Sequence, residues 1–163
     1  MTGVLPALVI INAPSSMVAI KVLAGEWHGD PGFAKRFEKE AKTLAQMNHP
    51  NIVSVYDFGI VGDYLYYVME YIEGTDLYQS MSLGLMTQDR VFEILPEVCD
   101  ALSYAHSKGI VHRDLKPDNF LFGIGSRAHY IYLVDLGLSK RFRDSKTDQH
   151  IGFKTEKSLT GTA

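Results

Sequence analysis

One charged segment constrains this chain more than any other feature. HRDLKPDN, residues 112–119, carries two acids, two bases, a histidine and an asparagine between the short apolar runs GIV and FLF. Pro117 prevents the segment from continuing as an α-helix, because proline lacks a backbone N–H and its ring clashes with the preceding turn. We therefore predict a loop in which Asp114, Lys116 and Asn119 converge on one point. A carboxylate, an ammonium and an amide suit a hydroxyl nucleophile, a transferring phosphoryl group and a divalent metal, respectively.

A second acidic position follows a strand-like run. YIYLV, residues 130–134, is almost wholly apolar and leads directly into Asp135 and Gly137. A carboxylate at the end of a buried strand, followed by a glycine that permits unusual backbone angles, suits a site for a metal ion and phosphate. The alternative is that both segments are turns with ordinary surface charges, but their joint occurrence favours a site.

A strand and a helix are predicted in the N-terminal third. MVAIKVL, residues 17–23, alternates so that Ala19 and Lys21 share one face. A helix is predicted over residues 31–47, with Asp30 as its N-cap and a proline in its first turn. The strand therefore directs a lysine to the same side as a small apolar residue.

Glu40 is the informative position of that helix. At 100° per residue it falls in the middle of the apolar stripe formed by Phe33, Phe37, Leu44 and Met47. A carboxylate on a buried helix face needs a hydrogen-bonding or cationic partner, and Lys21 is the nearest candidate in sequence order. The alternative is that Glu40 lies at the margin of the stripe and Lys21 extends along a strand edge towards water.

Two more strands and a long helix are predicted next. The strands cover residues 51–59 and 64–71. The helix covers residues 88–108, is capped by Thr87 and is ended by Gly109. Its apolar stripe consists of Val91, Leu95, Val98, Leu102 and Ala105.

The composition indicates one globular domain. With 163 residues, a net charge of −3 and a pI near 6.0, the chain shows no bias towards nucleic acid or an anionic membrane as its main partner. The apolar run at residues 4–13 is too short to span a bilayer and is interrupted by Pro6. Cys99 is the single cysteine and lies among apolar residues, which predicts a buried thiol in a reducing, cytoplasmic location.

Taken in order, these motifs resemble those of the protein kinase family. The motifs are VAIK at 18–21, the helix residue Glu40, MEY at 69–71, HRDLKPDN at 112–119 and DLG at 135–137. Up to Asn119 the chain looks most like bacterial-type serine/threonine kinases. The later segments NFLFG, YLVDLGLSKRFRD and KSLTGTA look like the casein kinase 1 group.

The resemblance implies an α+β fold and an activity. We expect an atypical N-terminal segment, residues 1–16, before an incomplete protein kinase domain, residues 17–163. Its N-lobe (17–71) would be a small antiparallel β-sheet with one helix, and its partial C-lobe (72–163) would be mainly helical. The implied activity is transfer of the γ-phosphate of ATP, bound with Mg²⁺, to serine or threonine hydroxyls of a protein substrate.

The resemblance also implies a role for individual residues. Asp114 would accept the proton of the substrate hydroxyl, Lys116 would meet the γ-phosphate, and Lys21, positioned by Glu40, would hold the α- and β-phosphates. The implied magnesium ligands are Asn119 and Asp135. The implied adenine site consists of Ala19, Leu121, the gatekeeper Met69 and the backbone of Glu70 and Ile72. Lys116 favours serine or threonine over tyrosine as the acceptor.

The chain departs from the family pattern at several places. Residues 1–17 contain only Gly3, so no glycine-rich phosphate-covering loop is identified, and Leu136 replaces the usual phenylalanine of the family. The helices that follow in the family would cover the apolar stripe of the long helix, which is otherwise expected to be exposed. Residues 138–162 would form the activation segment, with Thr162 near Asp114. A second hypothesis is therefore a non-catalytic kinase remnant or interaction module.

Overall fold

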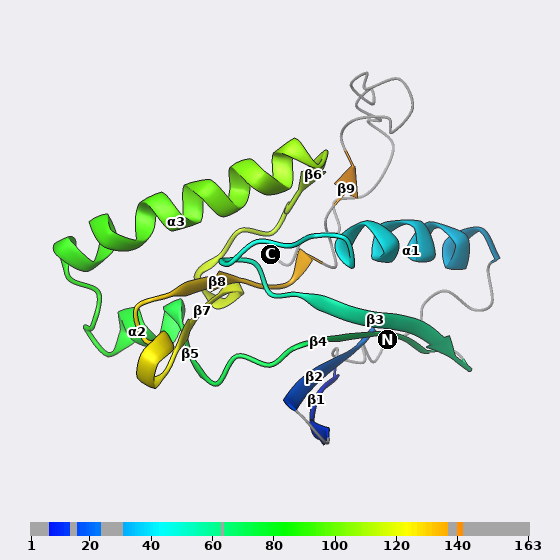
Figure 1. The fold of residues 1–163 in the computed structure, drawn as a ribbon, viewed down its shortest axis with the longest axis horizontal. Coiled ribbons are helices and arrows are strands. Elements are labelled where there is room, and N and C mark those ends of the chain that lie inside the picture. The colour runs from blue at the N-terminus through cyan, green and yellow to red at the C-terminus, as the bar shows by residue number, and fades with distance from the viewer. Residues whose placement is uncertain (1–6, 14–15, 24–30, 63, 137–139, 142–163) are drawn as a thin grey trace, which may run out of the picture.

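The computed structural model describes residues 7–13, 16–23, 31–62, 64–136 and 140–141 (Figure 1). Its N-terminal part is a four-stranded antiparallel sheet with the order β1-β2-β4-β3. The elements of this part are β1 (Ala7–Ala13), β2 (Ser16–Leu23), α1 (Pro31–Leu44), β3 (Val55–Val61) and β4 (Tyr64–Glu70). Strand β1 lies in the segment that was predicted to be atypical, and its pairing with β2 was not predicted.

The alternation predicted for β2 is confirmed. Ala19 is buried and Lys21 is half-buried, and they lie opposite Met69 and Tyr67 of β4 in the antiparallel register. Directly opposed residues of an antiparallel pair point to the same face of the sheet. The register therefore places the Lys21 side chain beside Tyr67 on the inner face.

Helix α1 ends earlier than predicted, and Glu40 is not buried. Because the helix ends at Leu44, Met47 belongs to the following turn and not to the helical stripe. Phe37 and Leu44 are buried and Ala41 is 0% exposed, so the centre of the stripe is turned away from Glu40. Glu40 is exposed. The expectation of a buried carboxylate is therefore wrong. Of the alternative, the position of Glu40 at the margin of the stripe is correct, but the extension of Lys21 towards water is not, because its side chain is only 17% exposed.

The C-terminal part combines helices with a three-stranded sheet, β5-β7-β8, and a two-stranded sheet, β6-β9. Figure 1 shows α3 as the longest element of this part, on the same side as β6. The elements are β5 (Gly74–Asp76), α2 (Leu77–Ser82), α3 (Gln88–Ser107), β6 (Ile110–Val111), the 3₁₀ turn η1 (Pro117–Asn119), β7 (Phe120–Gly123), the 3₁₀ turn η2 (Gly125–Arg127), β8 (Ile131–Leu133) and β9 (Lys140–Arg141).

Helix α3 begins where predicted, and its packing face overlaps the predicted stripe only in part. Ala105 is buried and Val98 and Leu102 pack against the core, whereas Val91 and Leu95 are exposed. The Thr87 hydroxyl accepts a hydrogen bond from the Arg90 N–H at 3.2 Å, as expected of an N-cap. The helix contributes the buried residues Ile94, Ala101 and Ala105 to the core. Cys99 lies about 160° around the helix from Ala101 and is exposed. The prediction of a buried thiol is therefore wrong.

Residues 51–54, predicted as the start of a strand, instead connect the two parts of the molecule. Strand β3 begins only after residues 51–54. Within them, Ile52 forms an isolated parallel bridge with Leu133 of β8. The Val53 N–H donates to the Leu133 carbonyl at 3.0 Å, and the Leu133 N–H donates to the Asn51 carbonyl at 2.8 Å. This loop is thus attached to the strand that leads into Asp135.

One apolar core extends through both parts. Among its buried members are Phe37, Leu44, Leu65, Tyr67, Ala101, Ala105, Ile131, Leu133 and Leu136. Across the residues that the structure describes, no helix has both the length and the apolar character needed to cross a membrane.

Candidate active site

His112 is the buried centre of the charged loop. Its side chain is 1% exposed, and its Nε2 lies 2.8 Å from the Val134 carbonyl oxygen. The Asp114 N–H donates to Nδ1 at 3.4 Å. Because Nδ1 accepts, Nε2 carries the hydrogen and donates it to Val134. One side chain thus connects the loop around Asp114 to the segment that precedes Asp135.

The convergence predicted for Asp114, Lys116 and Asn119 is confirmed. The Lys116 ammonium lies 3.4 Å from the Asp114 carboxylate. Asn119 is buried in η1, and its Nδ2 donates to the Asp114 carbonyl at 2.7 Å and lies 3.5 Å from the Asp114 carboxylate. Because the amide nitrogen is turned towards Asp114, the amide oxygen faces the other way.

The β7-β8 hairpin brings Asp135 to this loop. Asn119 immediately precedes β7, and its carbonyl accepts a hydrogen bond of 2.9 Å from the Val134 N–H. Asp135 follows directly and has a φ of 64°, while Arg113 in the loop has a φ of 73°. This left-handed region is sparsely populated by residues other than glycine, and such residues cluster at functional sites. Both residues belong to the segments that the sequence analysis singled out.

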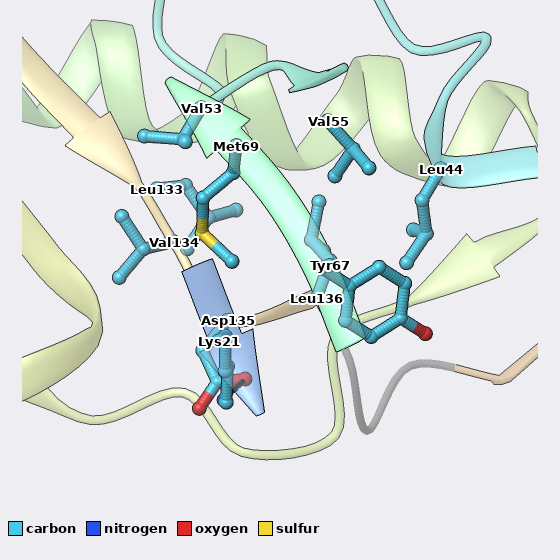
Figure 2. Close-up of a pocket in the computed structure, with 10 residues that line it drawn as sticks. All are labelled: Lys21, Leu44, Val53, Val55, Tyr67, Met69, Leu133, Val134, Asp135 and Leu136. Atoms are coloured by element: carbon cyan, nitrogen blue, oxygen red, sulfur yellow. Dashed lines mark hydrogen bonds and ion pairs between the residues drawn. The ribbon is translucent and has the colours of Figure 1, made fainter. Parts of the chain in front are cut away.

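Lys21 reaches this site from the N-terminal sheet. Its Nζ forms an ion pair with the Asp135 carboxylate, and Figure 2 shows the two side chains next to each other. The side chains are 17% and 23% exposed. The predicted role of Glu40 in positioning Lys21 stays a prediction, whereas the ion pair with Asp135 was not predicted.

A small cavity lies behind this ion pair. Its volume of about 30 Å³ leaves room for about one water molecule. Figure 2 shows that its wall is mainly apolar. The lining residues are Lys21, Leu44, Val53, Val55, Tyr67, Met69, Leu133, Val134, Asp135 and Leu136. Three of the predicted site residues, Lys21, Met69 and Asp135, are thus among the residues that line it.

Tyr67 is a cavity residue that the sequence analysis did not single out. It is buried between α1 and β2, and its ring centroid lies 5.1 Å from that of Phe37. Burial raises the pKa of its phenol, and the negative charges of Glu40 and Asp135 raise it further. The alternation of YLYYVMEY, which places Tyr67 on the face of Met69, could have identified it.

The predicted adenine-site residues lie close to one another around the connection between the two parts. Ala19 is opposite Met69 in the register of β2 and β4. Met69 and Leu121 pack against the apolar cluster that contains Ile72. The Glu70 N–H donates to the Ser54 carbonyl at 2.9 Å, which fixes the backbone at the end of β4.

The oxygen ligands available here fit a small divalent cation. Among the described residues, no group of three or more histidine, cysteine, aspartate or glutamate side chains is arranged to hold a metal. Mg²⁺ does not require such a cage, because it is usually held by one or two protein oxygen ligands together with water and substrate phosphates. The Asp135 carboxylate and the Asn119 amide oxygen are donors of this kind.

Three predictions lie outside the described residues. They concern Asp30 as a helix cap, Gly137 after the site aspartate, and Thr162 beside Asp114. Of the expected activation segment, residues 138–162, only the backbone of β9 is described.

Comparison with known proteins gives consistent matches. The family model of the protein kinase domain matches residues 7–162. The chain is 40% identical over 123 residues to serine/threonine-protein kinase pkn2 of Myxococcus xanthus, covering 76% of this chain and 15% of that protein. It is 39% identical over 133 residues to serine/threonine-protein kinase PknB of Mycobacterium tuberculosis, covering 78% of this chain and 21% of that protein. It thus spans about a fifth or less of the length of these curated relatives.

Proposed function

Because the chain belongs to the protein kinase domain family, and to its serine/threonine members, we propose that it transfers the γ-phosphate of ATP to serine or threonine hydroxyls of a protein substrate. The observation that carries the proposal is the joining of two groups of charged residues. The cluster of Asp114, Lys116 and Asn119 is linked through His112 and Val134 to the ion pair of Lys21 with Asp135. In phosphoryl transfer the protein contributes mainly by positioning the reactants and stabilising charge, and its own side chains form no covalent bond to the phosphate.

In this proposal Asp114 is the proton acceptor. Its carboxylate takes the proton of the substrate hydroxyl as the oxygen attacks the γ-phosphate. The bond from His112 to its backbone and the bond from Asn119 to its carbonyl hold the residue in place. The Lys116 ammonium, 3.4 Å from this carboxylate, offers positive charge to the phosphoryl group beside the acceptor. Its presence supports serine or threonine as the acceptor.

Lys21 and Asp135 serve the nucleotide phosphates. Lys21 offers its ammonium to the α- and β-phosphates, and Glu40, at the margin of the apolar stripe of α1, is proposed to position it. Mg²⁺ bound to the nucleotide would be held by Asp135 and the Asn119 amide oxygen, and it would neutralise phosphate charge. The ion pair of Lys21 with Asp135 brings the proposed phosphate-binding group and the proposed metal ligand together.

The adenine ring is proposed to lie at the connection between the two parts. Ala19 and Leu121 would enclose it, Met69 would limit its depth, and the backbone of Glu70 and Ile72 would bond its edge. The packing of Met69 and Leu121 around Ile72 supports this placement. The two parts are proposed to be the two lobes, predicted at residues 17–71 and 72–163, with β1 added to the first of them. The cytoplasm, where ATP and thiols are maintained, is the proposed location.

The second candidate, a non-catalytic interaction module, rests on two observations. Residues 4–24 contain no glycine that could form a phosphate-covering loop. Several apolar side chains of α3 and the loop before it are exposed, namely Leu83, Leu85, Val91, Phe92 and Leu95. Such a surface suits binding of another protein segment. This candidate predicts that the protein binds its partner equally well with and without ATP.

Substitution of Asp114 in the full-length protein tests the two candidates. Asp114→Asn keeps the size of the side chain and removes the proton acceptor, so phosphate transfer to a protein substrate should fall by about 10²–10⁴-fold. Asp118→Asn, an exposed position in the same loop, is the matched control and should stay within about threefold of the unaltered protein. Equal rates of phosphate transfer by Asp114→Asn and the unaltered protein would contradict the role of Asp114 as the proton acceptor. No transfer and no Mg²⁺-ATP binding by the unaltered protein would favour the interaction module.

A further inference from the structure

A single arginine is linked to both ends of the short segment that connects the two parts of the molecule, to one end directly and to the other through Gly123. We propose that Arg127 is a positioning residue that fixes this connection, residues 71–73, and so holds the backbone of Glu70 and Ile72 in register for adenine. The inference rests on the proposed kinase function. It adds a residue from η2, far from the phosphate-binding groups, to the determinants of nucleotide affinity.

The guanidinium of Arg127 holds the N-terminal end of the connection. Its Nη1 donates to the Glu70 carboxylate at 3.3 Å. The Glu70 N–H is bonded to Ser54 in the N-terminal part, while its side chain turns to η2 in the C-terminal part. Glu70 is therefore held from both parts at once, at the residue whose carbonyl is proposed to face adenine.

The backbone of Arg127 is packed against Gly123, the strand partner of the residue that follows the connection. A Cβ placed on Gly123 would lie 2.6 Å from the Arg127 Cβ and 2.8 Å from its carbonyl oxygen. Gly123 in turn pairs with Gly74, the first residue of β5, where an added Cβ would lie 1.7 Å from the Phe122 carbonyl oxygen. Only glycine permits these close approaches. Arg127 is therefore linked to the Gly74 end of the connection through Gly123 and to its Glu70 end through the ion pair.

The charges of this ion pair act on one tyrosine of each part, Tyr56 of β3 and Tyr132 of β8. Burial raises the pKa of both phenols, and at each of them Glu70 raises the pKa while Arg127 lowers it. The charges of the pair therefore act on a strand of each part, as expected for a contact that crosses the connection.

The exposure of the pair determines the size of the expected effect. The Arg127 side chain is 57% exposed and that of Glu70 is 24% exposed. Ion pairs this accessible contribute little to folding, and their contribution corresponds to at most about a fivefold change in an equilibrium constant. We expect this change in the nucleotide affinity and not in the rate of the chemical step, because the pair holds the backbone that is proposed to contact adenine.

The test compares variants of the full-length protein by calorimetric titration with ADP and Mg²⁺ and by the KM for ATP. Arg127→Met keeps the packing on Gly123 but removes the charge, and we expect Kd for ADP and KM for ATP to rise about three- to fivefold with kcat within twofold. Lys42→Met is the matched control, because Lys42 forms an exposed ion pair with Glu38 at 3.7 Å on α1. It should leave the Kd unchanged.

Charge reversal separates electrostatic positioning from packing. Arg127→Glu should weaken ADP binding more than Arg127→Met does, and adding Glu70→Arg should restore it. At 0.5 M salt the difference between Arg127→Met and the unaltered protein should shrink, because screening weakens an exposed pair. Equal Kd values for Arg127→Met and the unaltered protein would overturn the role of Arg127 and leave the kinase proposal intact. No ADP binding by the unaltered protein would overturn both.

Discussion

The two halves of the candidate site are held by contacts of very different range. In the charged loop, Asp114 is contacted by Lys116 and Asn119, which lie at most five positions away. Lys21 meets Asp135 across 114 positions and comes from a different sheet. A short-range contact closes a small loop, whereas the long-range pair forms only when the two parts of the molecule pack together.

Contacts within the charged loop therefore depend on the loop alone, whereas the ion pair of Lys21 with Asp135 depends on how the two parts are arranged. The loop can keep its hydrogen bonds when the N-terminal sheet shifts, because the partners of Asp114 lie in the loop itself. The ion pair of Lys21 with Asp135 would be broken by such a shift, because its two residues belong to different parts. Substitutions on the two sides of the site should therefore affect different properties of the protein.

Within the long-range half of the site, the largest effect is expected from Lys21→Met. The substitution removes the positive charge offered to the nucleotide phosphates but keeps an unbranched apolar stem, so transfer should fall by about 10²–10³-fold while the fold is retained. Steady-state rates with a protein substrate measure this change. Lys39→Met, at an exposed position of α1, is the control. A fall of less than tenfold for Lys21→Met would show that the long-range half of the site is not needed for transfer.

A large effect is also expected from Asp135→Asn, measured as the stabilisation of the folded protein by Mg²⁺-ATP. Asparagine tolerates the positive φ at this position, so the backbone should be kept. Mg²⁺-ATP at 100 times its Kd should stabilise the unaltered protein by about 2.7 kcal/mol, and the variant should lose most of this gain. Thermal melts with and without Mg²⁺-ATP measure it, with Asp118→Asn as the control. A full shift in the Asp135→Asn melt would exclude the carboxylate as a necessary ligand.

The same division explains what could be predicted from the sequence. The alternation of β2, the start of α3 at Thr87 and the convergence around Asp114 were all predicted correctly, because each depends on a local period, a cap or a loop of a few residues. The family resemblance through these motifs was also confirmed by the match to the protein kinase domain.

The errors arose where burial depends on distant packing. Glu40 was expected to be buried because a helix continued to Met47 would place it in the apolar stripe, but the chain leaves the helix at Leu44. Cys99 was expected to be buried because α3 is apolar around it, but the core contact runs through Ala101 and Ala105. The partner of Lys21 could not be chosen either, since no local pattern relates it to a residue in another sheet.

A smaller effect, on stability, is expected from His112→Phe. The substitution keeps a buried ring but removes the donor to the Val134 carbonyl and the acceptor of the Asp114 N–H. Leaving buried polar groups without partners should lower the free energy of unfolding by about 1–3 kcal/mol, as measured by urea denaturation. His129→Phe, at an exposed position, should change it by less than about 0.5 kcal/mol. Equal urea midpoints and slopes for the two variants would show that the loop is held without His112.

The smallest effect is expected at alkaline pH from Tyr67→Phe. Burial and the nearby carboxylates raise the pKa of the Tyr67 phenol in the folded protein, whereas the unfolded chain ionises it at the ordinary pKa of about 10. The unfolded chain therefore loses this proton first, and stability falls as the pH rises above about 10 towards the folded pKa, by up to about 1.4 kcal/mol per pH unit.

Urea denaturation between pH 9 and 11 measures this slope. Tyr67→Phe should remove the part of the slope that this residue causes, and Tyr78→Phe, at a position that is 58% exposed, should not. An unchanged slope for Tyr67→Phe would mean that another group controls the alkaline loss of stability. A reduced slope would place an uncharged phenol beside the long-range ion pair, where the negative charges of Glu40 and Asp135 already oppose its ionisation. The long-range half of the site would then depend on a buried neutral group as well as on its two charges.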